Sequence, residues 1–398
     1  MSSLSKYLAL EGNIRVLALQ TLISQLGFGM LFVVWQPYIL STGLTIIDLG
    51  IIQSVINLST AMGLFFWGPI SDLFGRKRVM LLGHASRVVA VLALVISGDP
   101  VFLYVFAFFI GFSALWMQSN PARTALLAES VSNEKRATAY GTLMAIGQGT
   151  SMVMASVGGY IAIVSGYWPI FAVTVVCETI GITIMLLFVR ETHHTAGANR
   201  REAGYRIISN LRPEVEMMPI YLMMVVMGIG YGVGFSLFYG ALTDNYGFTP
   251  FELGLMSTAS SLAWALGSIP SGKLSERFGT HKMVLASTAS ALITVVGFIL
   301  FRSFPAFLVF SIFNGLDPCF WIPNWTSIIA ERAPVKVRAS IFGKLDAYNR
   351  FAGIPAPFFG GLIYARYGFT APLLVHLAFL LIWGYMLFRI TSKPKTAT

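Results

Sequence analysis

The sequence predicts an all-α integral membrane protein with twelve transmembrane helices arranged in two pseudo-symmetric six-helix bundles. Of its 398 residues, 56% are hydrophobic and only 11% are charged, whereas ordinary soluble domains carry about 25% charged residues. Apolar runs that reach the ~20 residues needed to cross the hydrocarbon core recur along the chain. The second half also repeats a pattern of glycines and charges found in the first half.

The apolar runs define twelve predicted helices, and an even number places both ends of the chain on the same side. The opening residues lack an apolar core followed by a small-residue cleavage site, so we expect the first helix to remain in the protein. The predicted spans are 14–40, 46–68, 78–97, 101–126, 137–163, 168–189, 217–242, 250–272, 282–301, 306–329, 339–364 and 371–389.

The net charge of +10 is distributed unevenly over these predicted spans. In one set of loops the only basic residues are Arg302 and Arg366, and most others lie at the opposite face. Because basic loops stay in the cytoplasm, both termini are predicted to be cytoplasmic, in the inner (plasma) membrane of a prokaryote. The charge distribution therefore indicates that the protein lies in a lipid bilayer and has no nucleic-acid partner. We also expect the protein to be a monomer.

The longest polar segment, 190–216, separates six spans from six. It predicts an N-terminal bundle over 1–189, a cytoplasmic linker over 190–216 and a C-terminal bundle over 217–398.

A repeat relates the two predicted bundles. Shifting the chain by 204 residues places Asp72 on Glu276 and Gly75 on Gly279, in the loop between the second and third spans of each half. A second match, at an offset of 202, pairs Glu129 with Glu331, Arg136 with Arg338 and Gly141 with Gly343. Parallel repeats of this kind form two bundles around a midplane site that opens alternately to each side.

The chain resembles the major facilitator superfamily over essentially its whole length. The most specific motif is the loop signature G-x-x-x-D-x-x-G-[RK]-[RK]-[RK], present as Gly68, Asp72, Gly75, Arg76, Lys77 and Arg78. The resemblance implies a network of charges that holds the two halves closed on the cytoplasmic side. Its further members would be the repeated residues Glu129, Arg136, Glu276, Glu331 and Arg338. The alternative is that the three basic residues only orient the loop.

Ionisable residues inside the predicted spans mark a candidate site. Each costs about 2.5–3.5 kcal/mol at the centre of a helix, so such residues usually face a cavity or a partner. Asn314, Asp317 and Trp321 share one face of the tenth helix, and Asp346 and Arg350 share one face of the eleventh. The predicted substrate-binding or proton-coupling residues are Asp317, Arg350, Asp346, Trp321, Asn314, Lys344 and Glu178.

Two structural alternatives apply to these charges. Asp346 and Arg350, four residues apart, could form only an intrahelical ion pair. Glu178 could likewise form a structural pair with Arg87 rather than carry a proton.

Together these patterns predict a secondary transporter that moves a small amphipathic organic solute by alternating access, with proton-coupled efflux as the first choice. The resemblance is nearest to the drug/proton antiporter-like branch, although Ala107 stands where that branch has an arginine and the fifth helix keeps only the terminal glycines of its signature, Gly158 and Gly159. The alternatives are a carrier of an organic anion or lipid-like metabolite, and a membrane receptor that binds a solute without moving it. No enzyme, metal site or cofactor other than the proton is predicted, because no nucleophile–base or metal-ligand spacing is present.

Overall fold

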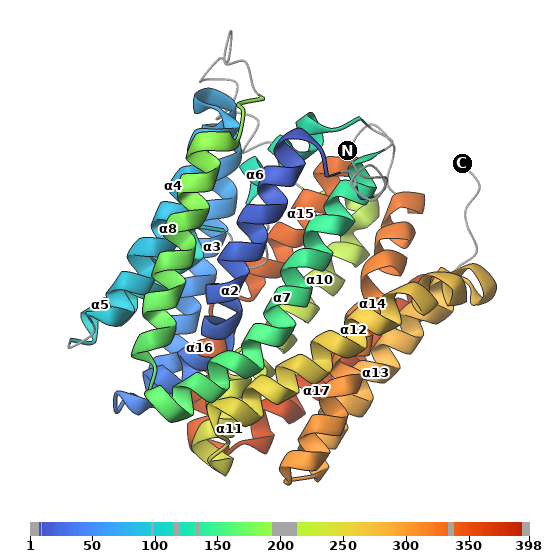
Figure 1. Ribbon diagram of the computed structural model, residues 1–398. Helices are drawn as coiled ribbons and strands as arrows, with labels where there is room; N and C mark the ends of the chain where they lie inside the picture. The colour runs from blue at the N-terminus through green and yellow to red at the C-terminus, as the bar shows by residue number, and fades with distance from the viewer. Residues whose placement is uncertain are drawn as a thin grey trace. The chain divides into compact units, whose positions relative to one another are not determined.

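Helices are the only regular secondary structure in the part of the chain that the computed structural model describes (Figure 1). It describes residues 8, 10–96, 99–114, 120–132, 135–192, 213–332 and 338–391, without the side chains of 137, 269, 330, 338–340 and 391. Within these residues, eight helices are long and apolar enough to cross a membrane.

The contacts of the chain divide it into two compact units. Unit 1 comprises Met1–Ile39 and Val55–Ser209, and unit 2 comprises Leu40–Ser54 and Asn210–Thr398. Leu40–Ser54 belongs to unit 2 because the helix that begins at Ile46 lies, at its start, against the helix that contains Pro357. A Cβ added at Gly50 would lie only 2.7 Å from the backbone oxygen of Pro357.

Unit 1 carries the helices of the first six predicted spans. They are α2 (Gly12–Ser41), α3 (Ile46–Phe74), α4 (Arg76–Val95), α5 (Val101–Phe112), α6 (Pro121–Ser130), α7 (Arg136–Ser165) and α8 (Trp168–Phe188), with the ends of α2 and α3 that border the intervening turn assigned to unit 2.

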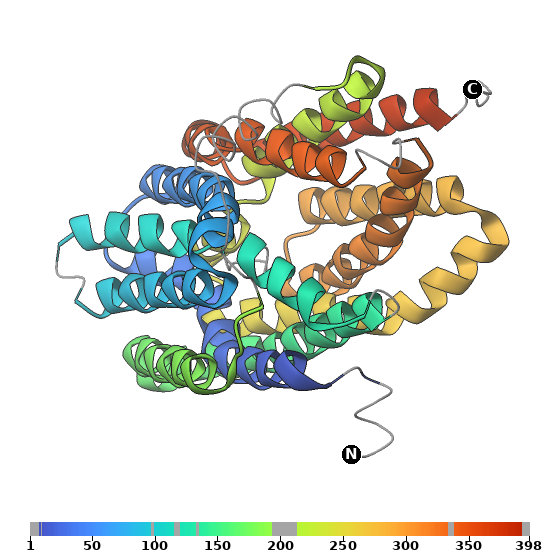
Figure 2. The ribbon, with the colours of Figure 1, turned by 90° about the horizontal axis from the view of Figure 1, so that it is seen from above.

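Unit 2 carries the helices of the last six predicted spans. They are the short 3-10 helix η2 (Val215–Met217) and the α-helices α10 (Met218–Gly234), α11 (Phe238–Tyr246), α12 (Pro250–Phe278), α13 (Thr280–Leu300), α14 (Phe304–Arg332), α15 (Arg338–Ala352), α16 (Ala356–Tyr367) and α17 (Thr370–Thr391). Helices α13 and α14 lie against each other, as the orange part of Figure 2 shows.

Three predicted spans are each divided between two helices. The fourth comprises α5 and α6, and α6 begins with Pro121 at its first turn, capped by the side chain of Asn120, which accepts from the Ala122 backbone N–H at 3.0 Å. A proline suits this position because the first helical N–H needs no intrahelical partner. The seventh span comprises α10 and α11, and the eleventh comprises α15 and α16 with Pro355 between them. Pro355 therefore lies at the interruption of the eleventh span, whereas Pro318 and Pro323 lie inside the continuous helix α14.

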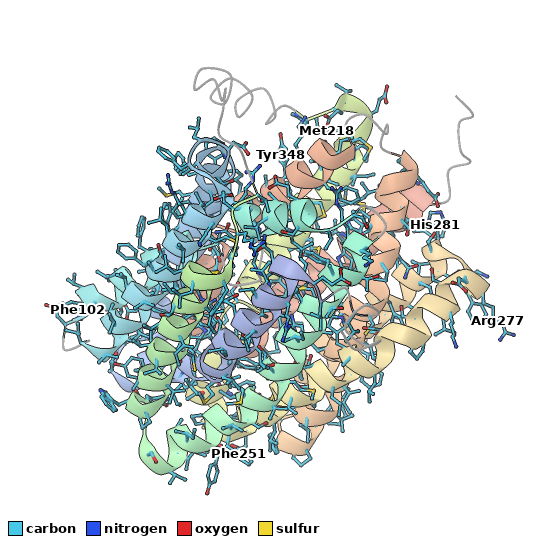
Figure 3. All side chains as sticks on the ribbon, turned by 45° about the horizontal axis from the view of Figure 1, so that its top comes forward. Phe102, Met218, Phe251, Arg277, His281 and Tyr348 are labelled. Atoms are coloured by element: carbon cyan, nitrogen blue, oxygen red, sulfur yellow. The ribbon has the colours of Figure 1, made fainter. Side chains whose placement is uncertain are left out.

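The repeat predicted from the sequence recurs in backbone conformation. Gly75 between α3 and α4 has φ 96° and ψ 153°, and its counterpart Gly279 between α12 and α13 has φ 88° and ψ 150°. Gly166 and Gly368, 202 residues apart, also match, with φ 77° and 79°. Only glycine adopts such positive φ angles without strain, so each half needs glycine at the same turns. Arg277 and His281 lie on the two sides of the turn at Gly279 (Figure 3).

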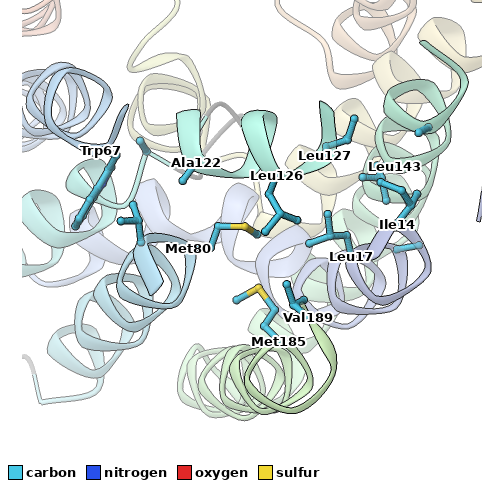
Figure 4. Close-up of a cluster of buried hydrophobic side chains, with 14 residues drawn as sticks. Ile14, Leu17, Trp67, Met80, Ala122, Leu126, Leu127, Leu143, Met185 and Val189 are labelled. Atoms are coloured by element: carbon cyan, nitrogen blue, oxygen red, sulfur yellow. The ribbon is translucent and has the colours of Figure 1, made fainter. Parts of the chain in front are cut away.

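Each unit has its own apolar core. In unit 1, Leu17, Met80, Leu126 and Met185 bring together side chains from α2, α4, α6 and α8 (Figure 4). These four side chains are at most 1% exposed. In unit 2 a separate cluster forms around residues of α10, α14, α15 and α17, including Trp325 and Trp383.

Candidate functional site

The loop between α3 and α4 carries the most specific sequence motif, and its charges are paired inside unit 1. Arg76, at the start of α4, contacts Asp72 at 2.5 Å and Glu129 of α6 at 3.2 Å. Its Nη1 also donates to the Ser71 hydroxyl at 2.6 Å. Arg76 therefore joins the ends of α3, α4 and α6.

Of the two residues that follow Arg190 after α8, Glu191 contacts this loop and Thr192 contacts Glu129 of α6. The Glu191 carboxylate accepts from the backbone N–H groups of Arg76 and Lys77, at 2.9 and 3.1 Å. An acid at this position is favoured because the first N–H groups of a helix have no intrahelical acceptor and carry partial positive charge. Thr192 donates to Glu129 at 2.6 Å. The first residues after α8 are thus held on the motif loop.

The corresponding loop of unit 2 has different chemistry. The position that matches Arg76 is Thr280, so the guanidinium that joins three helices in unit 1 has no counterpart there. Glu276 and Glu331 lie exposed near the ends of α12 and α14, and the side chain of Arg338 lies outside the described residues. Arg136 donates to the backbone oxygen of Ala128 at 2.8 Å. The role of these residues in closing the protein stays a prediction.

A cavity of about 90 Å³ lies within unit 2, lined by side chains of α10, α13, α14 and α17 and by Phe235 after α10. This volume has room for several water molecules or a small organic group. The polar residues of its lining are Ser287, Thr288, Thr294, Asn314, Asp317 and His376, with the phenol of Tyr231. Among the described residues, the lining includes no lysine or arginine, and Asp317 is its one acidic group.

Asp317 projects from α14, and its carboxylate accepts a hydrogen bond from the Ser287 hydroxyl of α13. Asn314 lies one turn earlier on the same face and donates to Ser260 at 3.4 Å. The predicted face of the tenth helix is therefore the one that lines the cavity. A carboxylate there could bind a proton or a cationic group, because the surrounding surface is mostly apolar and offers it few donors.

Aromatic rings form much of the rest of the lining. Trp321 stacks on Trp325 at 4.5 Å between ring centroids and meets Trp383 edge to face at 5.0 Å. The indole N–H of Trp383 and Nδ1 of His376 are buried without a hydrogen-bond partner in the described part of the chain. Because buried polar atoms are rarely left unpaired, these two groups are natural partners for a bound solute.

The other predicted residues of unit 2 lie outside the cavity lining. Arg350 pairs with Asp346 at 3.0 Å, one turn apart on α15, and Lys344 pairs with Glu214 at 2.7 Å. Partial burial acts to raise the pKa of Glu214, but hydrogen bonds from Lys344 and Tyr221 outweigh it and leave the pKa lowered. Asp346 and Arg350 thus form the intrahelical ion pair, and Lys344 binds Glu214 in the segment before α10.

Glu178 lies in unit 1, in a cluster that is completely buried. Its carboxylate contacts Arg87 at 3.3 Å and Nδ1 of His84 at 2.8 Å, both from α4. Ser24 of α2 donates to the same carboxylate, and Gln20 of α2 contacts Nε2 of His84 at 3.3 Å. The predicted Glu178–Arg87 pair is therefore present as part of a larger network.

Three residues, in the cavity of unit 2 and in or near the buried cluster of unit 1, were not predicted from the sequence. His84 and His376 were passed over because only acids, lysines and arginines were considered inside the spans. Arg123 is 4% exposed and donates to Thr21 at 2.9 Å, although it falls inside the predicted fourth span. Applying the rule for ionisable residues to every polar group in a span would have selected all three.

Comparison with known proteins identifies the family. The model of the Major Facilitator Superfamily matches residues 17–239 and 220–398. Multidrug resistance protein MdtG of Enterobacter lignolyticus is 22% identical over 329 residues, which cover 82% of this chain and 78% of that protein. MdtG of Escherichia fergusonii is 22% identical over 352 residues, 87% of this chain and 86% of that protein.

Solved structures agree on the fold. The nucleoside transporter NupG superposes with a TM-score of 0.78 at 11% identity, over 96% of this chain and 100% of that chain. The human organic anion transporter MFSD10 gives a TM-score of 0.66 at 16% identity, over 94% and 98%. These structures and the family model confirm the predicted fold, and the family model shows that the chain is a multi-pass membrane transporter and not an enzyme. Because the family model covers nearly all of its length, the chain belongs to the Major Facilitator Superfamily.

Proposed function

We propose that this transporter exports a small amphipathic organic solute that carries a basic or cationic group, in exchange for protons. The observation that supports this most is the cavity in unit 2, where one carboxylate, Asp317, faces a lining rich in aromatic rings. Aromatic faces and a carboxylate are the groups that bind organic cations. The solute and a proton would compete for Asp317, and that competition would couple their movements in opposite directions.

The similarity to multidrug resistance proteins supports export over uptake. The charges of the motif loop support a gate, because Arg76 joins three helix ends that must hold their positions when a bundle moves as one body. We propose that this face lies in the cytoplasm, with both termini, in the plasma membrane.

The predicted alternative, a carrier of organic anions, would need a free cation at the site. Arg350 is paired with Asp346 and Lys344 with Glu214, so both predicted cations already have acidic partners. The described residues that line the cavity also include neither lysine nor arginine. These contacts favour the cationic solute.

A binding screen followed by a flux assay tests the proposal. The purified protein would be heated with a panel of organic cations, anions and neutral compounds, because a ligand of the folded state raises the unfolding temperature. We expect cationic aromatic compounds to stabilise the wild type and to lose this effect in Asp317→Asn. Stabilisation only by anions would contradict the proposal.

The compounds that bind would then be loaded into proteoliposomes with an imposed pH gradient. We expect the gradient to drive their movement through the wild type. In Asp317→Asn the driven movement should disappear. The control Asp346→Asn, altered outside the cavity, should retain it. Driven movement that survives in Asp317→Asn would remove Asp317 from the coupling step.

A further inference from the structure

The buried cluster of unit 1 contains a titratable group that the proposed function does not use. Glu178 is completely buried, and the side chains of Arg87 and His84 are 4% and 3% exposed. Burying charges in a membrane segment is costly, so they are retained mainly where they pair or act in transport. A pair between Arg87 and Glu178 alone would neutralise both charges and would need no imidazole.

The contacts of His84 link three helices. Nδ1 faces Glu178 of α8, and Nε2 faces the side-chain amide nitrogen of Gln20 on α2. This pattern suits a neutral ring that donates from Nδ1 to the carboxylate and accepts at Nε2 from the amide. A second proton would turn Nε2 into a donor, and Gln20 would then have to present its oxygen instead.

The charged groups near His84 influence how readily its ring binds a second proton. Among the described residues they are Glu178 on α8, Arg87 on its own helix and Arg123 on α6. Helix α5 carries no charged residue, and Gln20 and Ser24 of α2 contact the cluster through neutral groups. Arg87, Glu178 and a neutral His84 together carry no net charge. Burial of the ring opposes a further proton on this group most strongly, the Glu178 carboxylate favours it, and the two arginines oppose it.

The cluster also retains unused hydrogen-bonding capacity. Nε and Nη2 of Arg87 are buried without a hydrogen-bond partner in the described residues, and its guanidinium lies 3.4 Å from the ring centre of Phe28. Since unpaired buried donors are rare, these two atoms are free to bond an acceptor that moves toward them. Repositioning of the Glu178 carboxylate on protonation of His84 would give Arg87 such an acceptor.

From this geometry we propose that His84 and Glu178 form a proton-binding site in unit 1, and that Gln20 transmits its occupancy to α2. The site is separate from Asp317, because the two lie in different units. It deepens the proposed function by adding a second proton site, and only its effect on transport rests on that function. The proton moves from water to the histidine–carboxylate pair and leaves by the same equilibrium, so no other reactant is needed.

Nuclear magnetic resonance of the purified, full-length protein in lipid nanodiscs tests the site without any solute or pH gradient. The five histidines are labelled with nitrogen-15, and the His84 signals are assigned by their absence in His84→Gln. We expect the His84 nitrogens to change from the neutral to the charged pattern in one step as pH falls. In Glu178→Gln this step should move to lower pH, because the neutral amide no longer favours the charged ring.

Three results would overturn the proposal. The first is a His84 signal that stays neutral over the whole pH range in which the wild type is folded. The second is a transition at the same pH in Glu178→Gln, which would show that the carboxylate takes no part. The third concerns α2: the side-chain amide signal of Gln20, assigned by Gln20→Leu, should shift together with His84, and an unchanged signal would contradict transmission.

A flux assay separates this proposal from the proposed function. In proteoliposomes, His84→Gln should change the pH dependence of transport and leave solute-for-solute exchange intact. If the wild type itself ignores the pH gradient, the proposed function fails, whereas the proton site is still decided by the resonance experiment. A driven transport rate in His84→Gln that follows the wild-type pH profile would contradict a role in coupling.

Discussion

The buried pair of Arg87 and Glu178 allows a quantitative prediction. Both side chains are at most 4% exposed and lie 3.3 Å apart, so neither charge can be solvated when its partner is removed. Removing one member of a buried pair typically costs about 3–5 kcal/mol. We therefore expect Arg87→Met and Glu178→Gln each to reduce the ratio of folded to unfolded protein by roughly two to three and a half orders of magnitude.

The double variant carries no unpaired charge in this cluster, so its loss of stability should be smaller than the sum of the two single losses. Neutral partners remain, since Gln at 178 can still bond His84 and Ser24, whose atoms already contact this side chain. A coupling of about 0.5–3 kcal/mol is expected for such neighbours.

The measurement is reversible unfolding of the wild type, both single variants and the double variant in the same lipid or mixed-micelle system. The exposed pair of Lys135 and Glu11, 3.6 Å apart and more than 40% exposed on both sides, is the matched control. Glu11→Gln should change the free energy of unfolding by about 0–1 kcal/mol. Purely additive losses at Arg87 and Glu178 would refute the assignment of the pair as a coupled buried unit.

Three further predictions concern packing, the motif loop and pH. Gly158→Ala should lower the unfolding temperature, because the new Cβ would lie 2.6 Å from the Met30 Cα of α2 and overpacking costs about 1–3 kcal/mol. Gly149→Ala on the same helix is the control, because its Cβ would meet nothing within 4 Å. Equal effects of the two substitutions would contradict this packing. Asp72→Asn removes the negative charge that pairs with Arg76 at 2.5 Å, so it should slow transport while membrane insertion stays normal. Flux in proteoliposomes and the amount of inserted protein would check this, and an unchanged rate would argue against the gate. The pKa of Glu214 is lowered in the folded protein, so its contribution to stability is present above the ordinary pKa of 4.5 and is lost as pH falls through the lower folded value. The stability difference between wild type and Glu214→Gln, measured from neutral pH down to acid pH, should therefore vanish only below about pH 4.5, and a difference independent of pH would be inconsistent with the Lys344 pair.

Much of the fold follows from sequence because two strong constraints act on it. The hydrocarbon core requires long apolar helices, and the duplicated turns require glycine at positions such as Gly75 and Gly279. Both constraints leave local patterns. The breaks inside the fourth and seventh spans were not predicted, because an apolar run looks the same whether one helix or two pass through it.

The candidate site was predicted only in part. The face of α14 that carries Asn314, Asp317 and Trp321 could be derived from helical spacing alone. The pairing of Asp317 with Ser287, and the place of His376 in the same cavity, depend on how α13 and α17 pack against α14. Such packing between helices leaves no periodic signal in the sequence. Arg350 was predicted at the same site as Asp317 because it is ionisable and shares a face of the eleventh helix with Asp346, and helical spacing does not specify which neighbouring helix that face meets.

Competition between a proton and a solute at Asp317 is the central claim, and proton release on binding tests it most directly. Wild-type protein in weakly buffered detergent solution would receive a saturating amount of a compound that binds, and the change in pH would be recorded. At a pH where Asp317 is protonated, about one proton per bound solute should be released by the wild type and none by Asp317→Asn. Binding by the wild type with no proton release over the whole working pH range would contradict the account.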